Sequence, residues 1–216
     1  MNQEIKFNLL AELLEYPQDS FQDLLNNSEI MLNNFDDEVK DLFSKFVSSV
    51  KESSLEKLQE LYVKTFELNP ACTPYVGVHI FGEDGYKRGT FMARLKQAYT
   101  ENGLENNSEL PDHISQILKL PSCLNDENKY NTLLAECVIA PIALMLNEFG
   151  CNNKSENLDD DTSSRQYWNS DSTGIKNNRK VNTANNYNDD PNPYKYLLMA
   201  IKRTAELSQK KGVKHA

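Results

Sequence analysis

The sequence predicts an all-α protein, a single-domain helical bundle built from 216 residues. Apolar residues recur at helical spacing in four consecutive segments before residue 70. The connections between these segments are only a few residues long, as they usually are between antiparallel helices. No segment shows the sustained two-residue alternation of a half-buried strand, so a mixed α/β fold has little support.

The ends of the first four helices carry local signals. The apolar stripes run over residues 3–15, 21–32, 35–50 and 55–66. Tyr16-Pro17 ends the first, because the residue before a proline is pushed out of helical geometry. Ser53 and Glu56 match a capping box that opens the fourth, and Asn69-Pro70 ends it.

The middle of the chain is less regular. Residues 70–85 hold prolines and glycines with no helical stripe, so an irregular segment is expected there. A helix is predicted from about Lys87 to Asn102-Gly103, which supplies the C-cap. A polar loop then leads to a short helix that starts near Ile114 and is expected to close at Pro121.

Residues 127–148 are apolar nearly all round, which is typical of a helix buried at the centre of a protein. Pro141 lacks a backbone N–H, so it is expected to kink this helix.

Composition changes abruptly after Gly150. Residues 151–193 are rich in Asn and Asp and have few large aliphatic residues, so this segment is predicted to be disordered. Trp168 within it is interpreted as a loosely held surface residue, with docking onto the body or a partner as the alternative. An amphipathic helix over 194–209 is expected to pack back on the helical domain formed by residues 1–150.

Charge and cysteine content narrow the classes of function. A net charge of −9 argues against nucleic acid as a partner, because phosphate contacts need clustered Lys and Arg. No 18-residue apolar run and no basic leader are found, so neither a membrane span nor a signal peptide is expected. The four cysteines form no CxxC pair, which indicates free thiols in a cytoplasmic protein and no metal site.

Three clusters stand out as candidate functional residues. Tyr62 and Phe66 share one helix face, an ordinary core pattern when taken alone. His79 precedes a glycine-rich stretch and Arg88, whose guanidinium could pair with Glu83 or with a ligand carboxylate. A structural histidine and a loop ion pair are the alternative interpretation. Glu109, Asp112 and His113 place two carboxylates and an imidazole at one turn, which is expected to be exposed and able to hold a basic peptide.

An enzyme is weakly supported. Asp112 and His113 could act in a hydrolase only with a serine or cysteine nucleophile, and the sequence nominates none. No glycine-rich phosphate-binding motif is present, and no cofactor is expected.

The stretch YVKTFELNPACTPYVGVHIFGEDGYKRG, followed by LKQAYTENGL and ELPDHI, resembles the NarJ branch of the NarJ/TorD/DmsD redox-enzyme maturation chaperones. The likeness covers residues 60 to about 120, and the flanking helices fit the same all-helical fold. His79, Gly82, Arg88 and Gly89 match one element of the family, and Glu109, Pro111, Asp112 and His113 match the ELPDH turn near its proposed peptide-binding surface.

The resemblance implies a cytoplasmic chaperone without enzymatic activity. Its client would be the N-terminal segment of a molybdopterin oxidoreductase catalytic subunit, with nitrate reductase as the default. Binding would last while molybdenum cofactor is inserted, possible further partners being the cofactor-insertion proteins. The residues expected to bind the client peptide are Tyr62, Phe66, Tyr75, His79, Arg88, Glu109, Asp112 and His113. The helical stripes alone allow a different function, a general adaptor that binds an amphipathic partner segment.

The expectation that the ELPDH turn is exposed leads to a prediction for two substitutions. Asp112→Ala and His113→Ala are expected to weaken client binding with little loss of fold stability.

Overall fold

The computed structural model describes residues 3–32, 35–82, 84–104, 109–151 and 192–212, and all regular structure in these ranges is helical. The prediction of an all-α fold is confirmed. The helices are α1 (Gln3–Glu12), α2 (Phe21–Leu32), α3 (Asp37–Val50), α4 (Leu55–Phe66), α5 (Val76–Phe81), α6 (Gly85–Glu101), α7 (Ile114–Ile117), α8 (Glu127–Leu133), α9 (Ala140–Cys151) and α10 (Pro193–Gly212), with a 3-10 turn η1 (Leu120–Cys123) and a π-helical segment η2 (Leu134–Ile139).

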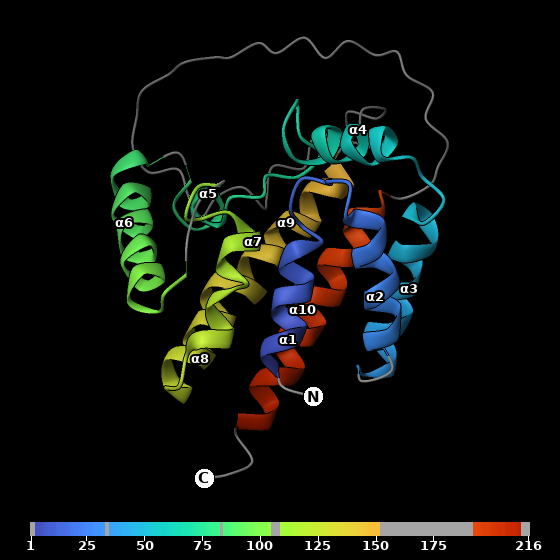
Figure 1. Ribbon diagram of the computed structural model, residues 1–216. Coiled ribbons are helices and arrows are strands. Elements are labelled where there is room, and N and C mark those ends of the chain that lie inside the picture. The colour runs from blue at the N-terminus through green and yellow to red at the C-terminus, as the bar shows by residue number, and fades with distance from the viewer. Residues whose placement is uncertain (1–2, 33–34, 83, 105–108, 152–191, 213–216) are drawn as a thin grey trace, which may run out of the picture.

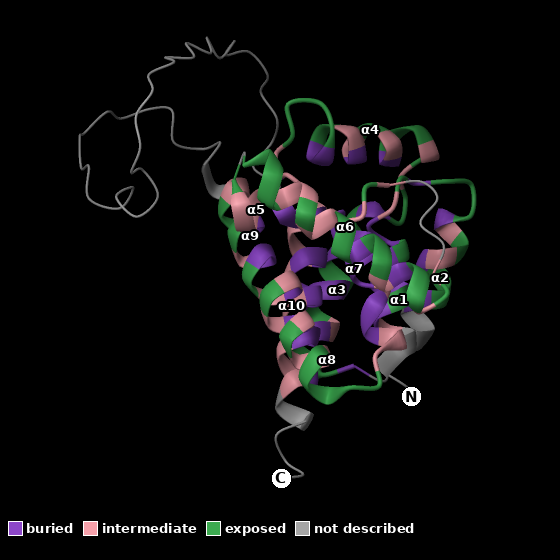
Figure 2. Ribbon diagram, turned by 90° about the vertical axis from the view of Figure 1, so that its left-hand side faces the viewer, coloured by how far each residue is buried: buried purple, intermediate pink, exposed green. Residues whose placement is uncertain are grey.

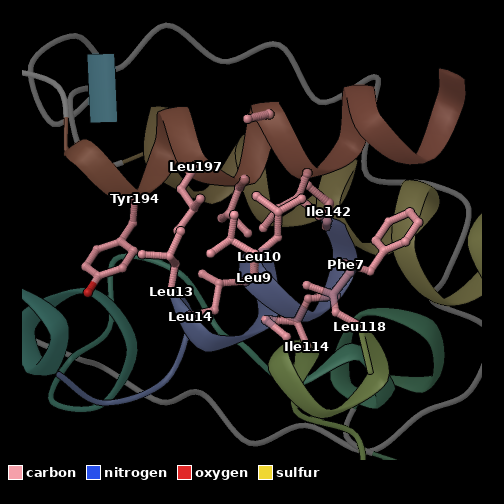
Figure 3. Close-up of a cluster of buried hydrophobic side chains, with 14 of the residues drawn as sticks. Phe7, Leu9, Leu10, Leu13, Leu14, Ile114, Leu118, Ile142, Tyr194 and Leu197 are labelled. Carbon is pink, nitrogen blue, oxygen red and sulfur yellow. The ribbon is translucent and has the colours of Figure 1, made fainter. Parts of the chain in front are cut away.

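The C-terminal helix α10 is a central element of the core. It runs through the body beside α1 and α3 (Figure 1), and it also packs against α9 and η2. Tyr194, Leu197, Leu198 and Ile201 are fully buried because their spacing places them on one helical face. Figure 3 shows Tyr194 and Leu197 facing leucines of α1 and of the segment that directly follows it. The expectation that this helix packs back on the domain is therefore confirmed.

Most helix ends follow their local signals, with shifts of one or two residues. The N-cap of α4 is Ser54 and not Ser53, because the Ser54 hydroxyl accepts from the backbone N–H of Lys57. Asn69 adopts a left-handed φ of 46° just after this helix. Pro121 does not close the short helix; α7 ends earlier, and the proline lies in the first turn of η1, where a missing N–H costs nothing.

The segment expected to be irregular contains the helix α5. Its residues VGVHIF include valine, isoleucine and glycine, which have low helix propensity, so no helix could be predicted there from local sequence. Tertiary contacts stabilise it instead: the N–H of Val76 donates to the carbonyl of Asp112 at 2.8 Å. Gly82 ends the helix with a positive φ of 63°.

The apolar helix over 127–149 differs from its prediction in two ways. The N–H of Ala140 donates to the carbonyl of Ala135, five residues back, so a π-helical segment precedes Pro141 and accommodates it. Burial all round is wrong, since only 28% of its most apolar 18-residue window is buried. By length and composition alone this helix could cross a membrane, a property shared with core helices of soluble proteins.

The predicted disordered segment and Trp168 lie outside the described residues, except for Cys151, Asn192 and Pro193. Among the described cysteines, Cys72, Cys123 and Cys137 are free.

Candidate functional site

Arg88 and Asp112 form a bidentate ion pair between α6 and the turn before α7. The Arg88 Nε atom donates to Asp112 Oδ2 at 2.7 Å, and Nη2 donates to Oδ1 at 3.2 Å. The Asp112 side chain is 0% exposed and that of Arg88 is 24% exposed. The partner of Arg88 is therefore a buried carboxylate of the chain itself, whereas Glu83, the partner suggested by the sequence, lies outside the described residues.

Gly77 lies directly against this ion pair. A Cβ atom at that position would stand 2.6 Å from Asp112 Oδ2 and 2.9 Å from Arg88 Cγ, closer than real contacts allow. The guanidinium of Arg88 also lies over the Tyr75 ring, 5.3 Å from its centroid. Glycine in α5 thus permits the close approach of three segments, and the low helix propensity of this helix is the consequence.

Asp112 and His113 of the Glu109–His113 turn lie in the interior, contrary to the expectation of an exposed turn, while Leu110 remains exposed. The backbone of the turn is hydrogen-bonded to both neighbouring segments: Tyr99 Oη donates to the Pro111 carbonyl at 2.7 Å, and the Val76 N–H donates to the Asp112 carbonyl at 2.8 Å. Asp112 and His113 are 0% and 2% exposed. A peptide at the surface cannot reach either side chain in this conformation.

His113 acts as the N-cap of α7. Its Nδ1 accepts from the backbone N–H of Ser115 at 3.2 Å and lies 2.7 Å from the Ser115 hydroxyl. Burial disfavours the imidazolium and lowers the pKa of His113 to about 4, although the neighbouring Asp112 opposes this shift. A neutral imidazole that caps a helix, beside a carboxylate committed to Arg88, leaves no acid–base pair for a hydrolase.

Tyr62 and Phe66 belong to the aromatic core. Their ring centroids lie 6.0 and 4.9 Å from that of Tyr194 on α10. Both side chains are buried, which supports their interpretation as ordinary core residues. In this conformation they do not reach the surface, where a client would make contact. Tyr75 and Glu109 are half-buried.

His79 connects α5 to α9. Its Nε2 lies 2.7 Å from the Thr73 carbonyl, so this nitrogen carries the proton and donates. Its Nδ1 lies 3.9 Å from Glu148 Oε1, while Glu148 Oε2 accepts from the Thr73 N–H at 2.7 Å. The three residues hold the start of α5 against α9, which supports the interpretation of a structural histidine.

An apolar groove of about 680 Å³ lies between α5, α6 and the η2–α9 helix. We call it the α5–α9 groove. Its apolar walls are formed by Ile80, Phe81, Phe91, Leu95, Pro141 and Leu144, and its charged residues are Arg94 and Glu136. Of the predicted residues only His79 lines it. The sequence signal that could have indicated it is the helix over 127–149, which has more apolar faces than its neighbours cover.

A second, more polar cavity of about 500 Å³ lies between α1 and α2. Its charged residues include Glu12, Glu15 and Asp23, and Lys119 reaches Glu15 at 2.6 Å. Burial, and then repulsion from Glu15, raise the pKa of Glu12. This cavity holds an internal ion pair, and its wall is a mixture of polar and apolar residues.

No described cluster of His, Cys, Asp or Glu has metal-binding geometry. Burial raises the pKa of the Cys72 thiol, and it raises that of Cys137 to about 11, so neither is an activated nucleophile. Within the described residues, the fold is an all-helical body with an open apolar groove, an arrangement that suits the binding of a partner segment.

A family model described as "Nitrate reductase delta subunit" matches residues 32–149, more than half of the chain. The chain therefore belongs to the nitrate reductase delta subunit family, whose members are non-catalytic maturation chaperones. This confirms the predicted resemblance and the prediction that the protein is not an enzyme. No curated protein matches the chain.

Proposed function

We propose that this protein is a maturation chaperone that binds the N-terminal segment of the catalytic subunit of nitrate reductase. Binding would hold that segment back from membrane attachment or export while molybdenum cofactor is inserted. Family membership supports the chaperone role and the catalytic subunit as partner. The observation that carries the proposal is the α5–α9 groove, an open apolar surface on a protein without catalytic machinery.

The size of the groove fits a releasable complex. Its volume lies within the range of about 300–1,000 Å³ common for ligand sites. Burying three or four apolar side chains, each worth about 1.5–3 kcal/mol before ordering costs, is enough for binding near 1 μM, or about −8 kcal/mol. A chaperone that must leave the mature enzyme needs affinity of this order.

The cellular location and the further partners follow from the same proposal. Chaperones of this family are cytoplasmic, and we place this one in the cytoplasm with no cofactor of its own. Cofactor-insertion proteins are its further partners. Of the residues named from the sequence, Tyr75, Arg88 and Glu109 are partly exposed, and His79 lines the groove although its side chain is only 5% exposed. We propose that these four border a bound client and that the buried ones support the fold.

Isothermal titration with a synthetic N-terminal peptide of the nitrate reductase catalytic subunit tests the proposal. We expect a dissociation constant in the micromolar range, and no heat with a scrambled peptide of the same composition. Absence of binding up to submillimolar peptide would refute it. A pull-down from native lysate separates the alternative: a general helical adaptor would capture other proteins in place of a molybdoenzyme.

A further inference from the structure

The α5–α9 groove owes its existence to one helix with an uncovered apolar face. Leu134, Val138, Ile142 and Met145 are buried on one side of the η2–α9 helix. On another side Leu144 is 46% exposed, although it belongs to the most apolar segment of the chain. Figure 2 shows half-buried and exposed residues along both α5 and α9.

The opposite wall is also apolar and is held in place. Phe81 of α5 and Phe91 of α6 contact each other edge-to-face, with ring centroids 5.5 Å apart. The His79–Thr73–Glu148 contacts fix α5 against α9, and the Arg88–Asp112 ion pair fixes α6. Because the walls are fixed before binding, an occupant does not have to order them, which favours affinity.

Two opposite charges border the groove. Glu136 on η2 and Arg94 on α6 are both exposed, and neither forms an ion pair with another described residue. Each is available to a charge of opposite sign on an occupant. Glu136 is the acidic residue among those that line the groove, whereas Glu148 lies outside the lining and accepts from the Thr73 N–H.

We propose that the α5–α9 groove binds an amphipathic helix of about three turns, with its apolar face against Leu144, Phe81 and Phe91. A basic residue at one border of that face pairs with Glu136, and an acidic residue at the other border pairs with Arg94. The two charges fix the direction and rotation of the helix, while the apolar contacts supply affinity. The proposal rests on the proposed function, in which this helix is the N-terminal segment of the client.

Two leucines of equal exposure allow binding at the groove to be distinguished from binding at the ELPDH turn. Leu144 lies in the groove and Leu110 in the turn, and each is 46% exposed. With the client peptide as probe, Leu144→Asp should weaken binding at least 30-fold, whereas Leu110→Asp should change it less than threefold. Circular dichroism and melting of each variant confirm that the fold is intact, which is expected because both side chains are exposed.

Charge reversal tests the orientation. Glu136→Lys should weaken peptide binding about tenfold, and a peptide whose bordering basic residue is replaced by glutamate should recover most of that loss. If wild-type protein binds the peptide and the groove variants bind it equally well, the groove assignment is overturned while the proposed function stands. If wild-type protein does not bind, the proposed function itself fails. Light scattering adds one further outcome: dimers that Leu144→Asp converts to monomers would make a second copy the occupant and overturn the proposal.

Discussion

Replacing Arg88 with alanine should destabilise the whole protein, although Arg88 lies partly at the surface. Arg88 supplies both hydrogen bonds to the Asp112 carboxylate, at 2.7 and 3.2 Å. With alanine at position 88 that carboxylate remains buried among α5, α6 and the turn without its cation. The structural expectation for the turn is thus opposite to the one drawn from its polar composition.

The magnitude follows from the burial of each partner. Removing one member of a buried ion pair costs about 3–5 kcal/mol. Arg88 is 24% exposed, so water reaches part of the vacated space, and we reduce the expected loss to about 2–4 kcal/mol. At about 2–4 °C per kcal/mol for a protein of this size, the melting temperature should fall by about 5–15 °C.

Urea unfolding followed by circular dichroism measures this loss. Lys87→Ala is the matched control, since Lys87 is a neighbouring exposed cation and its loss should stay within about 0.5 kcal/mol. Gly77→Ala should be destabilising by an independent route, because its Cβ would displace Asp112 and Arg88. A loss below about 1 kcal/mol for Arg88→Ala, or additive losses in the Arg88→Ala/Asp112→Ala double variant, would refute the reasoning.

Three other substitutions test other parts of the structure. The folded pKa of His113, about 4, lies below its ordinary 6.5, so its stabilising contribution is complete above pH 6.5 and is lost as pH falls toward 4. The free energy of unfolding of the wild-type protein should fall by about 2 kcal/mol between pH 7 and 5 because of His113, and His113→Asn, which keeps a helix cap, should abolish that part of the fall. If urea unfolding of the variant shows the same pH dependence as the wild type, the burial of a neutral imidazole is contradicted. Asp126→Ala removes the acceptor for two N–H groups of α8 and should lower the free energy of unfolding in urea by about 1 kcal/mol. An unchanged free energy would mean that this N-cap does not stabilise the protein. Tyr194→Ala should cost about 3–5 kcal/mol, since its ring fills the space between α3 and α4; a loss near zero would mean that α10 is not part of the core.

Helices with one apolar stripe could be predicted from the sequence, because periodicity reports directly which face is buried. This holds for α3 and α10, whose apolar positions are the buried ones. It fails for α5, where six residues with weak propensity are helical because Asp112 and Glu148 bind their flanking backbone. Contacts between distant segments decide such elements, and no local pattern contains them.

The candidate site was harder to predict because polar residues in a turn suggest exposure. Asp112 and His113 are polar, yet each is buried with a hydrogen-bond partner, Arg88 for Asp112 and the start of α7 for His113. Helical spacing alone predicts Tyr62 and Phe66 as ordinary core residues, and both are buried. Only the resemblance to the family added them to the residues expected to bind the client. The groove residues Phe91 and Leu144 carried no motif, so nothing in the local sequence separated them from core positions.

The residues at the Arg88–Asp112 contact and the residues that line the groove are under different steric constraints. Gly77, Arg88 and Asp112 lie in the stretches that resemble the family, and their side chains or backbone meet one another at van der Waals or hydrogen-bond distance. Such contacts tolerate few residue types, because a methyl group or a lost charge disrupts all three segments. Leu144 and Glu136 face open space, so many residues fit there without disturbing the fold. Residues of the groove can therefore change without disturbing the contacts of Gly77, Arg88 and Asp112. Proteins of this one fold would then bind different client segments, and the groove, not the ELPDH turn, would determine which client is bound.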